Sequence, residues 1–284
     1  MSTSSRGGAV SSLFSSIFRA KAAKAGGIIL VSLLVLILVG PLVVNYSPQA
    51  ITGPANLPPN FAHPFGTDYL GHDLFSQLVW GSYPSLTLSF LSALGGTLLG
   101  FGAGVVSGYY RKAESVIAGA TDVVLSFPTI PLLIIINVIF PGNDLIEAIT
   151  LIAVLWAPVS RAVRAQTLAV KRLSYVDAVR MSGMRDLKII WKVLAFEVAS
   201  IAMAFFIINL SVSVILVTAL EFLGVGNPLH VTWGSILFWA QKYAFGFGDW
   251  WWVLAPGAVI SLVAVSFALM GLSFEEIMNP RLRV

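Results

Sequence analysis

Apolar residues fall into six long runs, separated by shorter segments that carry most of the charge. A helix needs roughly 20 apolar residues to cross a bilayer, and lipid leaves its backbone groups no partner outside the helix. Each run is therefore predicted to be a membrane-spanning helix, and the fourth, which is short, is expected to extend towards Arg164. The six predicted spans are Gly26–Asn45, Pro84–Tyr110, Ser115–Phe140, Leu145–Ser160, Val193–Leu220 and Trp250–Phe274.

The composition agrees with a chain surrounded by lipid. Of the 284 residues, 57% are hydrophobic and 11% are charged, and the mean hydropathy is +0.87. Soluble domains carry roughly 25% charged residues, so we predict an all-α, polytopic membrane helix bundle with six transmembrane helices. The chain has no cysteine, which excludes a disulfide framework and a cysteine-based metal site.

The basic residues predict the orientation. Sixteen of the 17 lie in segments that alternating spans place on one side, and only Lys242 lies on the other. Because cytoplasmic loops are enriched in Lys and Arg, we expect both termini in the cytoplasm and a multi-pass protein of the cell (cytoplasmic) membrane. No clean A-x-A site follows the first span, which favours a retained anchor over a cleaved signal peptide. The predicted order is a cytoplasmic N-terminal segment 1–25, a first transmembrane anchor helix 26–46, an external segment 47–83, a core of five spans 84–274 with a cytoplasmic loop 161–192, and a cytoplasmic tail 275–284.

Two patterns predict how particular helices lie. In "DLFSQLV", Leu74 and Leu78 are spaced four residues apart, which is typical of an amphipathic helix on the membrane surface. In the second span, glycines recur every fourth residue and so share one helix face, where small residues let another helix approach closely. This face is either a static packing surface or a surface that slides during a conformational cycle. The four glycines are Gly96, Gly100, Gly104 and Gly108.

Acidic residues within spans are candidates for function. Asp122 lies within the third span, where it is either paired inside the bundle or part of an ion site. Glu147 and Glu197 lie near span ends, where we expect water to solvate them. One intramembrane acid without a chain of partner groups makes a poor proton relay. Prolines in the third and fourth spans should kink or break these helices unless neighbouring groups satisfy the freed carbonyls; they are Pro128, Pro131 and Pro158.

Sites for catalysis are hard to find in this chain. Its histidines, His63, His72 and His230, all fall in predicted external segments. The sequence contains neither H-E-x-x-H nor the phosphate-binding loop G-x-x-x-x-G-K-[ST]. We therefore expect no enzyme, no bound metal and no cofactor, and any ATP hydrolysis that drives the protein must occur on another chain.

The stretch "SYVDAVRMSGMRDLKIIWK" places a charged segment between the fourth and fifth spans. Ser174 and Asp177 match a capping box, which predicts a short helix that begins here. Gly183 is a natural helix stop, because glycine tolerates the left-handed conformation, and a second helix can begin at Met184. The segment is thus either a capped cytoplasmic helix on a glycine hinge or a basic surface loop.

The same residues resemble the EAA-type loop of binding-protein-dependent ABC importer permeases, whose pattern is E-A-A, three residues, then G. The resemblance implies that the short helix docks on a separate ATPase subunit and transmits the closure of that subunit to the spans. It implies this coupling role for Tyr175, Asp177, Ala178, Arg180, Gly183, Met184 and Asp186.

Further motifs narrow the resemblance to the dipeptide/oligopeptide/nickel type. "HPFGTDYLGHDLFSQ" is similar to H-P-x-G-T-D-x-x-G-R-D-x-x-S-R, and "SFPT", "WAPVSRAVRAQTL", "LEFLGVGNP" and "MNPRLRV" also resemble that group. The likeness extends from about residue 25 to the end and looks like the C-type subunit, with a type I ABC importer fold. The external motif comprises Gly66, Thr67, Asp68, Gly71 and Asp73.

The family resemblance implies partners rather than cofactors. These are a B-type permease subunit, two ATPase subunits that hold ATP and magnesium, an external substrate-binding protein and membrane lipid, with no nucleic acid. The cargo is a di- or oligopeptide, with oligosaccharide and nickel left open. An ion-coupled secondary transporter is the alternative; it would require buried ionisable pairs or inverted repeats, and neither is clear in the sequence.

The chain departs from the family pattern at five positions. Arginine is usual where this chain has His72 and Gln77, and glutamate is usual at Asp177. The loop normally ends with a histidine and a proline, which are replaced by Val193 and Phe196. These departures put the contacts near the end of the loop in doubt.

Overall fold

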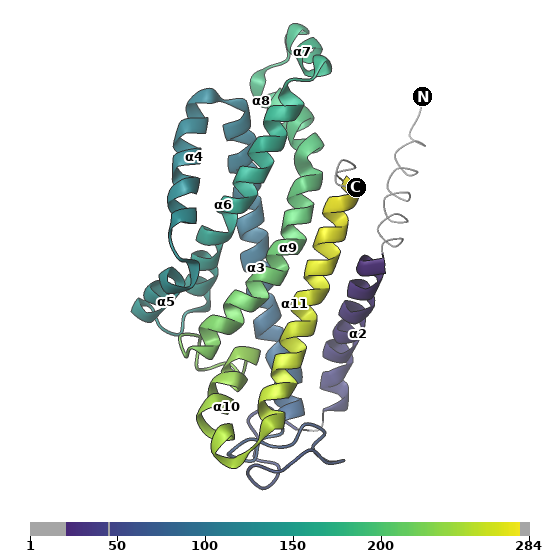
Figure 1. The fold of residues 1–284 in the computed structure, drawn as a ribbon, viewed down its shortest axis with the longest axis vertical. Helices are drawn as coiled ribbons and strands as arrows, with labels where there is room; N and C mark the ends of the chain where they lie inside the picture. Colours follow the sequence, from purple (N-terminus) through teal and green to yellow (C-terminus); the bar gives the residue numbers. More distant parts are fainter. Residues whose placement is uncertain (1–20, 45, 279–284) are drawn as a thin grey trace.

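The computed structural model describes residues 21–44 and 46–278 (Figure 1). Within these residues it has no β-strand, only two isolated bridges, so the all-α prediction is confirmed. The elements are α2 (Lys21–Val43), α3 (Leu74–Tyr109), α4 (Arg111–Ser126), α5 (Thr129–Ile139), α6 (Asp144–Lys171), α7 (Ser174–Met181), α8 (Asp186–Ile189), the π-helical turn η1 (Ile190–Leu194), α9 (Ala195–Phe222), α10 (Trp233–Phe247) and α11 (Trp250–Met278).

Four helical stretches of the described chain are long and apolar enough to cross a membrane. The stretch 186–222 is one of them, because α8, η1 and α9 follow one another without a break. In α2 the described apolar stretch is the shorter Ala23–Leu33, so the count of six spans stays a prediction. The four long stretches are Leu74–Tyr109, Asp144–Lys171, Asp186–Phe222 and Trp250–Phe274.

The third predicted span is not one straight helix. It divides into α4 and α5, which are bent by 88°. Phe127 and Pro128 are both extended between the two helices. Proline lacks the N–H that would continue α4 and disfavours a helical conformation in the residue before it. With this bent pair counted as one span, the described chain has five.

The predicted surface helix at Leu74 and Leu78 is not a separate element. It forms the first turns of α3, which continues for 36 residues through Pro84. The helix begins at Leu74 because Asp73 is extended and its carboxylate accepts a hydrogen bond from the Ser76 backbone N–H at 2.7 Å. Both leucines are buried, because α10, whose Trp233 donates its indole N–H to the Leu78 carbonyl at 3.0 Å, packs beside them.

The long helices form one bundle with two distinct ends (Figure 1). Helix α3 packs along α6, α9 packs against both of them and against α11, and α2 lies on α11. Helices α7 and α8 lie at one end, which we call the α7 end. Helix α10 and the loop between α2 and α3 lie at the opposite end, which we call the α10 end.

Candidate functional site

The α7 helix is eight residues long and begins differently from the prediction. Leu173, which is extended, occupies the N-cap position, and Ser174 is already the first helical residue. The serine hydroxyl therefore makes no capping bond, and the predicted capping box is wrong. Asp177 instead accepts a hydrogen bond from Arg180 Nη1 at 3.2 Å, one turn further along the helix.

A left-handed glycine separates α7 from α8. Gly183 has φ of +81°, and no atom lies within 4 Å of the position that a Cβ would occupy. A residue with a side chain would be strained here by its backbone alone, at a cost of about 1–2 kcal/mol. The chain then turns back, and Asp186 starts the helical stretch that becomes α9.

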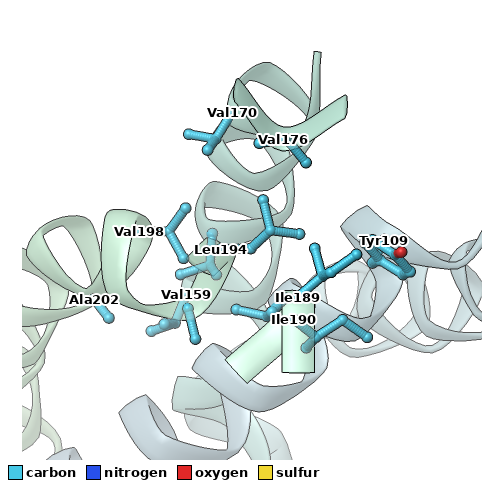
Figure 2. Packing of buried hydrophobic residues seen from close by; sticks show 12 residues of the cluster. Tyr109, Val159, Val170, Val176, Ile189, Ile190, Leu194, Val198 and Ala202 are labelled. Carbon is cyan, nitrogen blue, oxygen red and sulfur yellow. The ribbon is translucent and has the colours of Figure 1, made fainter. Parts of the chain in front are cut away.

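One apolar side chain of α7 anchors it to the bundle. Val176 is fully buried in a cluster with Ile189, Ile190 and Leu194, and with valines of α6 (Figure 2). Met184 packs against the same cluster. A displacement of α7 would therefore disturb residues at the start of the α9 span.

Tyr109, the last residue of α3, ties the segment to two further helices. Its hydroxyl donates to Asp186 Oδ1 at 2.6 Å, and its backbone carbonyl accepts from Lys171 Nζ at 2.6 Å. The Lys171 ammonium and the Arg180 guanidinium lie 5.0 and 5.9 Å from the ring centroid, within cation–π range. Sequence reasoning missed Tyr109; the only signal was its place directly after Gly108.

The α7–α8 segment also exposes large apolar side chains. Met181 is 83% exposed and Leu187 is 66% exposed, and Leu173 and Tyr175 are also exposed. Partial desolvation and the nearby Glu197 carboxylate raise the pKa of the Tyr175 phenol, which therefore stays protonated at neutral pH. Ala178 lies on the exposed surface as well. Exposed apolar groups beside charged ones are typical of a surface that another protein covers.

The four glycines of α3 lie against α6. A Cβ on Gly100 would lie 2.5 Å from the Trp156 carbonyl oxygen, and one on Gly104 would lie 2.8 Å from the Ser160 carbonyl oxygen. Gly96 and Gly108 face Leu155 and Thr167 in the same way. The backbones of α3 and α6 thus approach more closely than any larger residue would permit.

The external motif folds the loop at the α10 end. Asp73 caps α3 and also contacts His63 Nδ1 at 2.9 Å. Thr67 donates to the Pro54 carbonyl at 2.7 Å and accepts from the Leu57 N–H at 2.9 Å. Both motif glycines, Gly66 and Gly71, have positive φ.

Two of the departures from the family pattern meet at one carboxylate. Asp68 accepts from His72 Nδ1 at 2.7 Å and from Gln77 Nε2 at 3.0 Å, and also from the backbone N–H groups of Leu70 and His72. Asp68 as a whole residue is 4% exposed. All these bonds hold residues of the loop and of α3 together, so Asp68 organises this end of the molecule.

Asp122 and Glu147, two acids of the predicted spans, have different environments. Asp122 of α4 pairs with Arg161 of α6, and both side chains are more than half exposed. Glu147 is only 3% exposed, so the expectation that water solvates it is wrong; the first turn of α6 turns it inward. No cluster of three or more metal-ligating side chains occurs among the residues that the structure describes.

A cavity of about 300 Å³ opens at the α10 end. Tyr69 stacks on Tyr243 with ring centroids 4.1 Å apart, and Trp252 lies 5.8 Å from the same ring. Asp68 and Glu221 supply carboxylates to the lining, and Glu221 accepts from the Gly234 N–H at 3.2 Å. Aromatic walls with a few polar groups are typical of ligand pockets.

Comparison with known proteins identifies the family. Residues 96–284 match the family described as "Binding-protein-dependent transport system inner membrane component". The match covers more than half of the chain, which therefore belongs to this family of ABC importer permeases. The family and the apolar helices together define a multi-pass membrane protein.

Curated relatives are permeases of the peptide type. A putative peptide transport system permease protein of Brucella suis is 29% identical over 94% of this chain and 90% of its own length. The probable D,D-dipeptide permease DdpC of Escherichia coli is 30% identical over 89% and 86%. The dipeptide permease DppC of Bacillus subtilis is 30% identical over 93% and 83%.

A solved structure shows the same fold. A chain of the MetNI methionine ABC transporter, in inward-facing conformations, matches with a TM-score of 0.53 and 20% identity. The match covers 73% of this chain and 97% of the MetNI chain. At this identity the likeness concerns the fold alone.

Proposed function

We propose that this chain forms half of the translocation pathway of an ATP-driven importer and that α7 docks on a separate ATPase subunit. The observation that carries the proposal is the exposed apolar surface of a short segment that is fixed to the bundle. Met181 and Leu187 are turned outwards, while Val176 and the Tyr109–Asp186 bond hold the same segment in place.

This arrangement suits the transmission of motion. A force on α7 reaches α9 through Val176, Ile189 and Ile190, and it reaches α3 and α6 through Tyr109 and Lys171. Gly183 lets α7 change its angle relative to α8, because glycine has no Cβ and adopts positive and negative φ about equally readily. Closure of the ATPases would then move three spans together and alternate the access of the pathway.

The partners follow from the same proposal. A B-type permease would supply the other half of the pathway, two ATPase subunits would hold ATP and magnesium, and an external binding protein would dock at the α10 end. The cargo is a di- or oligopeptide, since the named relatives serve peptide and dipeptide systems. Both termini lie in the cytoplasm with α7.

The test is recovery of the ATPase with tagged variants of this chain. We expect Met181→Asp to reduce the ATPase recovered by about tenfold, because a buried interface side chain contributes about 1–3 kcal/mol. Leu229→Asp is the matched control, since Leu229 is 77% exposed but lies at the α10 end. Undiminished recovery and undiminished peptide-stimulated ATP hydrolysis in both Met181→Asp and Leu187→Asp would refute the docking role.

A further inference from the structure

A second cavity lies beneath α7. It has a volume of about 510 Å³ and opens between the end of α3, the start of α4, the end of α6 and one face of α7. Tyr109 forms part of its wall. No contact described above fills this space, and it lies apart from the exposed apolar side chains of Met181 and Leu187.

The lining of this cavity carries an excess of positive charge. It contains four basic side chains and two acidic ones. Both carboxylates are already engaged, Glu114 by Arg164 and Asp177 by Arg180. Within the described part of the chain, the other three basic residues form no ion pair; they are Arg111, Lys171 and Arg172.

These three cations come from two helix ends, the start of α4 and the end of α6. Arg111 begins α4, Lys171 ends α6, and Arg172 caps α6. Lys171 is held in place, because its ammonium donates to the Tyr109 carbonyl and lies over the ring of that residue. The arginines are exposed, and their planar, forked guanidinium groups match the geometry of phosphate oxygens.

We propose that this cavity binds a phosphate group, which Arg111, Lys171 and Arg172 contact. The cavity lies at the ends of the α3 and α6 helices, and the ends of spans are where we expect lipid headgroups to meet water. Basic pockets between membrane helices bind anionic headgroups in this position. The phosphate belongs either to an anionic phospholipid or to a soluble phosphate compound.

A phosphate here would also restrain α7. Arg180 lines the cavity and belongs to α7, whereas Arg111 and Arg172 belong to the ends of the membrane helices. A single anion between them joins the short helix to the bundle electrostatically. Binding of the phosphate itself is independent of the proposed ATPase contact, because it requires this chain alone.

The test is native mass spectrometry of the purified full-length chain in detergent, with added phosphatidylglycerol or phosphatidylcholine. We expect the wild type to retain phosphatidylglycerol preferentially. The double variant Arg111→Gln/Arg172→Gln should bind it roughly 25-fold more weakly, since each basic residue near an anionic lipid contributes about fivefold. The control Lys112→Gln/Arg185→Gln removes the same charge from exposed positions outside the cavity lining and should bind as the wild type does.

Inorganic phosphate distinguishes the two sources. Retention of phosphatidylglycerol without an effect of phosphate on the thermal unfolding midpoint identifies a lipid site. A higher midpoint with phosphate than with chloride at equal ionic strength, in the wild type and the control but not in the double variant, identifies a soluble ligand. Equal behaviour of the wild type and the double variant towards both ligands would overturn the proposal.

Discussion

Gly183 is the residue at which the chain turns between α7 and the fifth span. Because its φ is +81° and no atom crowds it, a substitution acts through the backbone alone. We expect Gly183→Leu to cost about 1–2 kcal/mol locally and to shift α7 without unfolding the bundle. The prediction is normal abundance in the membrane with about tenfold less peptide-stimulated ATP hydrolysis by the assembled transporter.

Gly119→Leu provides the control for this prediction. Gly119 is exposed in the middle of α4 and also has open space around it, but its backbone is helical. This variant should retain both abundance and stimulation. If the two leucine variants hydrolyse ATP equally well, the left-handed turn at Gly183 has no part in coupling.

Asp68 lies at the α10 end of the molecule, in the loop before α3. Replacement by alanine removes four accepted hydrogen bonds and leaves the His72 and Gln77 side chains without that partner. Hydrogen bonds to a charged group make a net contribution of about 1.5–3 kcal/mol each to stability, so Asp68→Ala should open the loop at residues 47–73. Amide hydrogen exchange of this loop should accelerate at least about tenfold, while exchange in α9 stays slow.

Asp144→Ala is the comparison for Asp68→Ala. Asp144 is 48% exposed and its one ion-pair contact, with His230, is 3.5 Å long. Its loss should leave exchange in the loop unchanged. Equal protection of the loop in both alanine variants would mean that the Asp68 network does not hold it.

At the scale of elements, the contact between α3 and α6 depends on glycine. Gly100 faces the Trp156 carbonyl and Val159, whereas Gly102 of the same helix faces open space. We expect Gly100→Leu to destabilise the protein by about 1–3 kcal/mol through overpacking. Gly102→Leu has the same effect on helix propensity and should be tolerated. Thermal unfolding in detergent measures the difference, and equal midpoints would contradict the close packing of α3 on α6.

Hydropathy predicted the long helices α3, α6, α9 and α11, because a run of about 20 apolar residues favours a helix that is shielded from water. It could not predict how they bend. Pro128 breaks its helix and Pro84 does not, although both remove one backbone donor. The difference arises from tertiary contacts, since the first turns of α3 are buried against α10 and the loop.

Helix α10 was missed for a related reason. Its 15 residues are too few to span a membrane, so the run length that predicts a span does not identify it. In the structure Trp233 is fully buried. Thr232 and Ser235 form a capping box at its start, but serine at the third helical position does not match the usual S/T-x-x-E/Q signature, so no such signal was present in the sequence there.

At the scale of the whole molecule, the contacts that fix α7 join distant parts of the chain. Tyr109 and Asp186 are 77 residues apart, and Tyr109 and Lys171 are 62 apart. A periodic pattern predicts neighbours three or four residues away, so no such pattern identifies these pairs. Only the family resemblance indicated Asp186 as a site residue. Neither the resemblance nor a sequence pattern indicated Tyr109, which donates a hydrogen bond to it.

Orientation in the membrane is the property on which the proposed function depends most. Met181 and Leu229 are both strongly exposed, and the α9 span separates them in the chain. The chain has no cysteine, so Met181→Cys and Leu229→Cys each introduce a single thiol. Because basic residues favour the cytoplasmic side, we expect a membrane-impermeant maleimide to label Leu229→Cys in right-side-out vesicles and Met181→Cys only after permeabilisation. The opposite result would place α7 outside the cell, where no ATPase could reach it, and labelling of both from one side would mean that α9 does not cross the membrane.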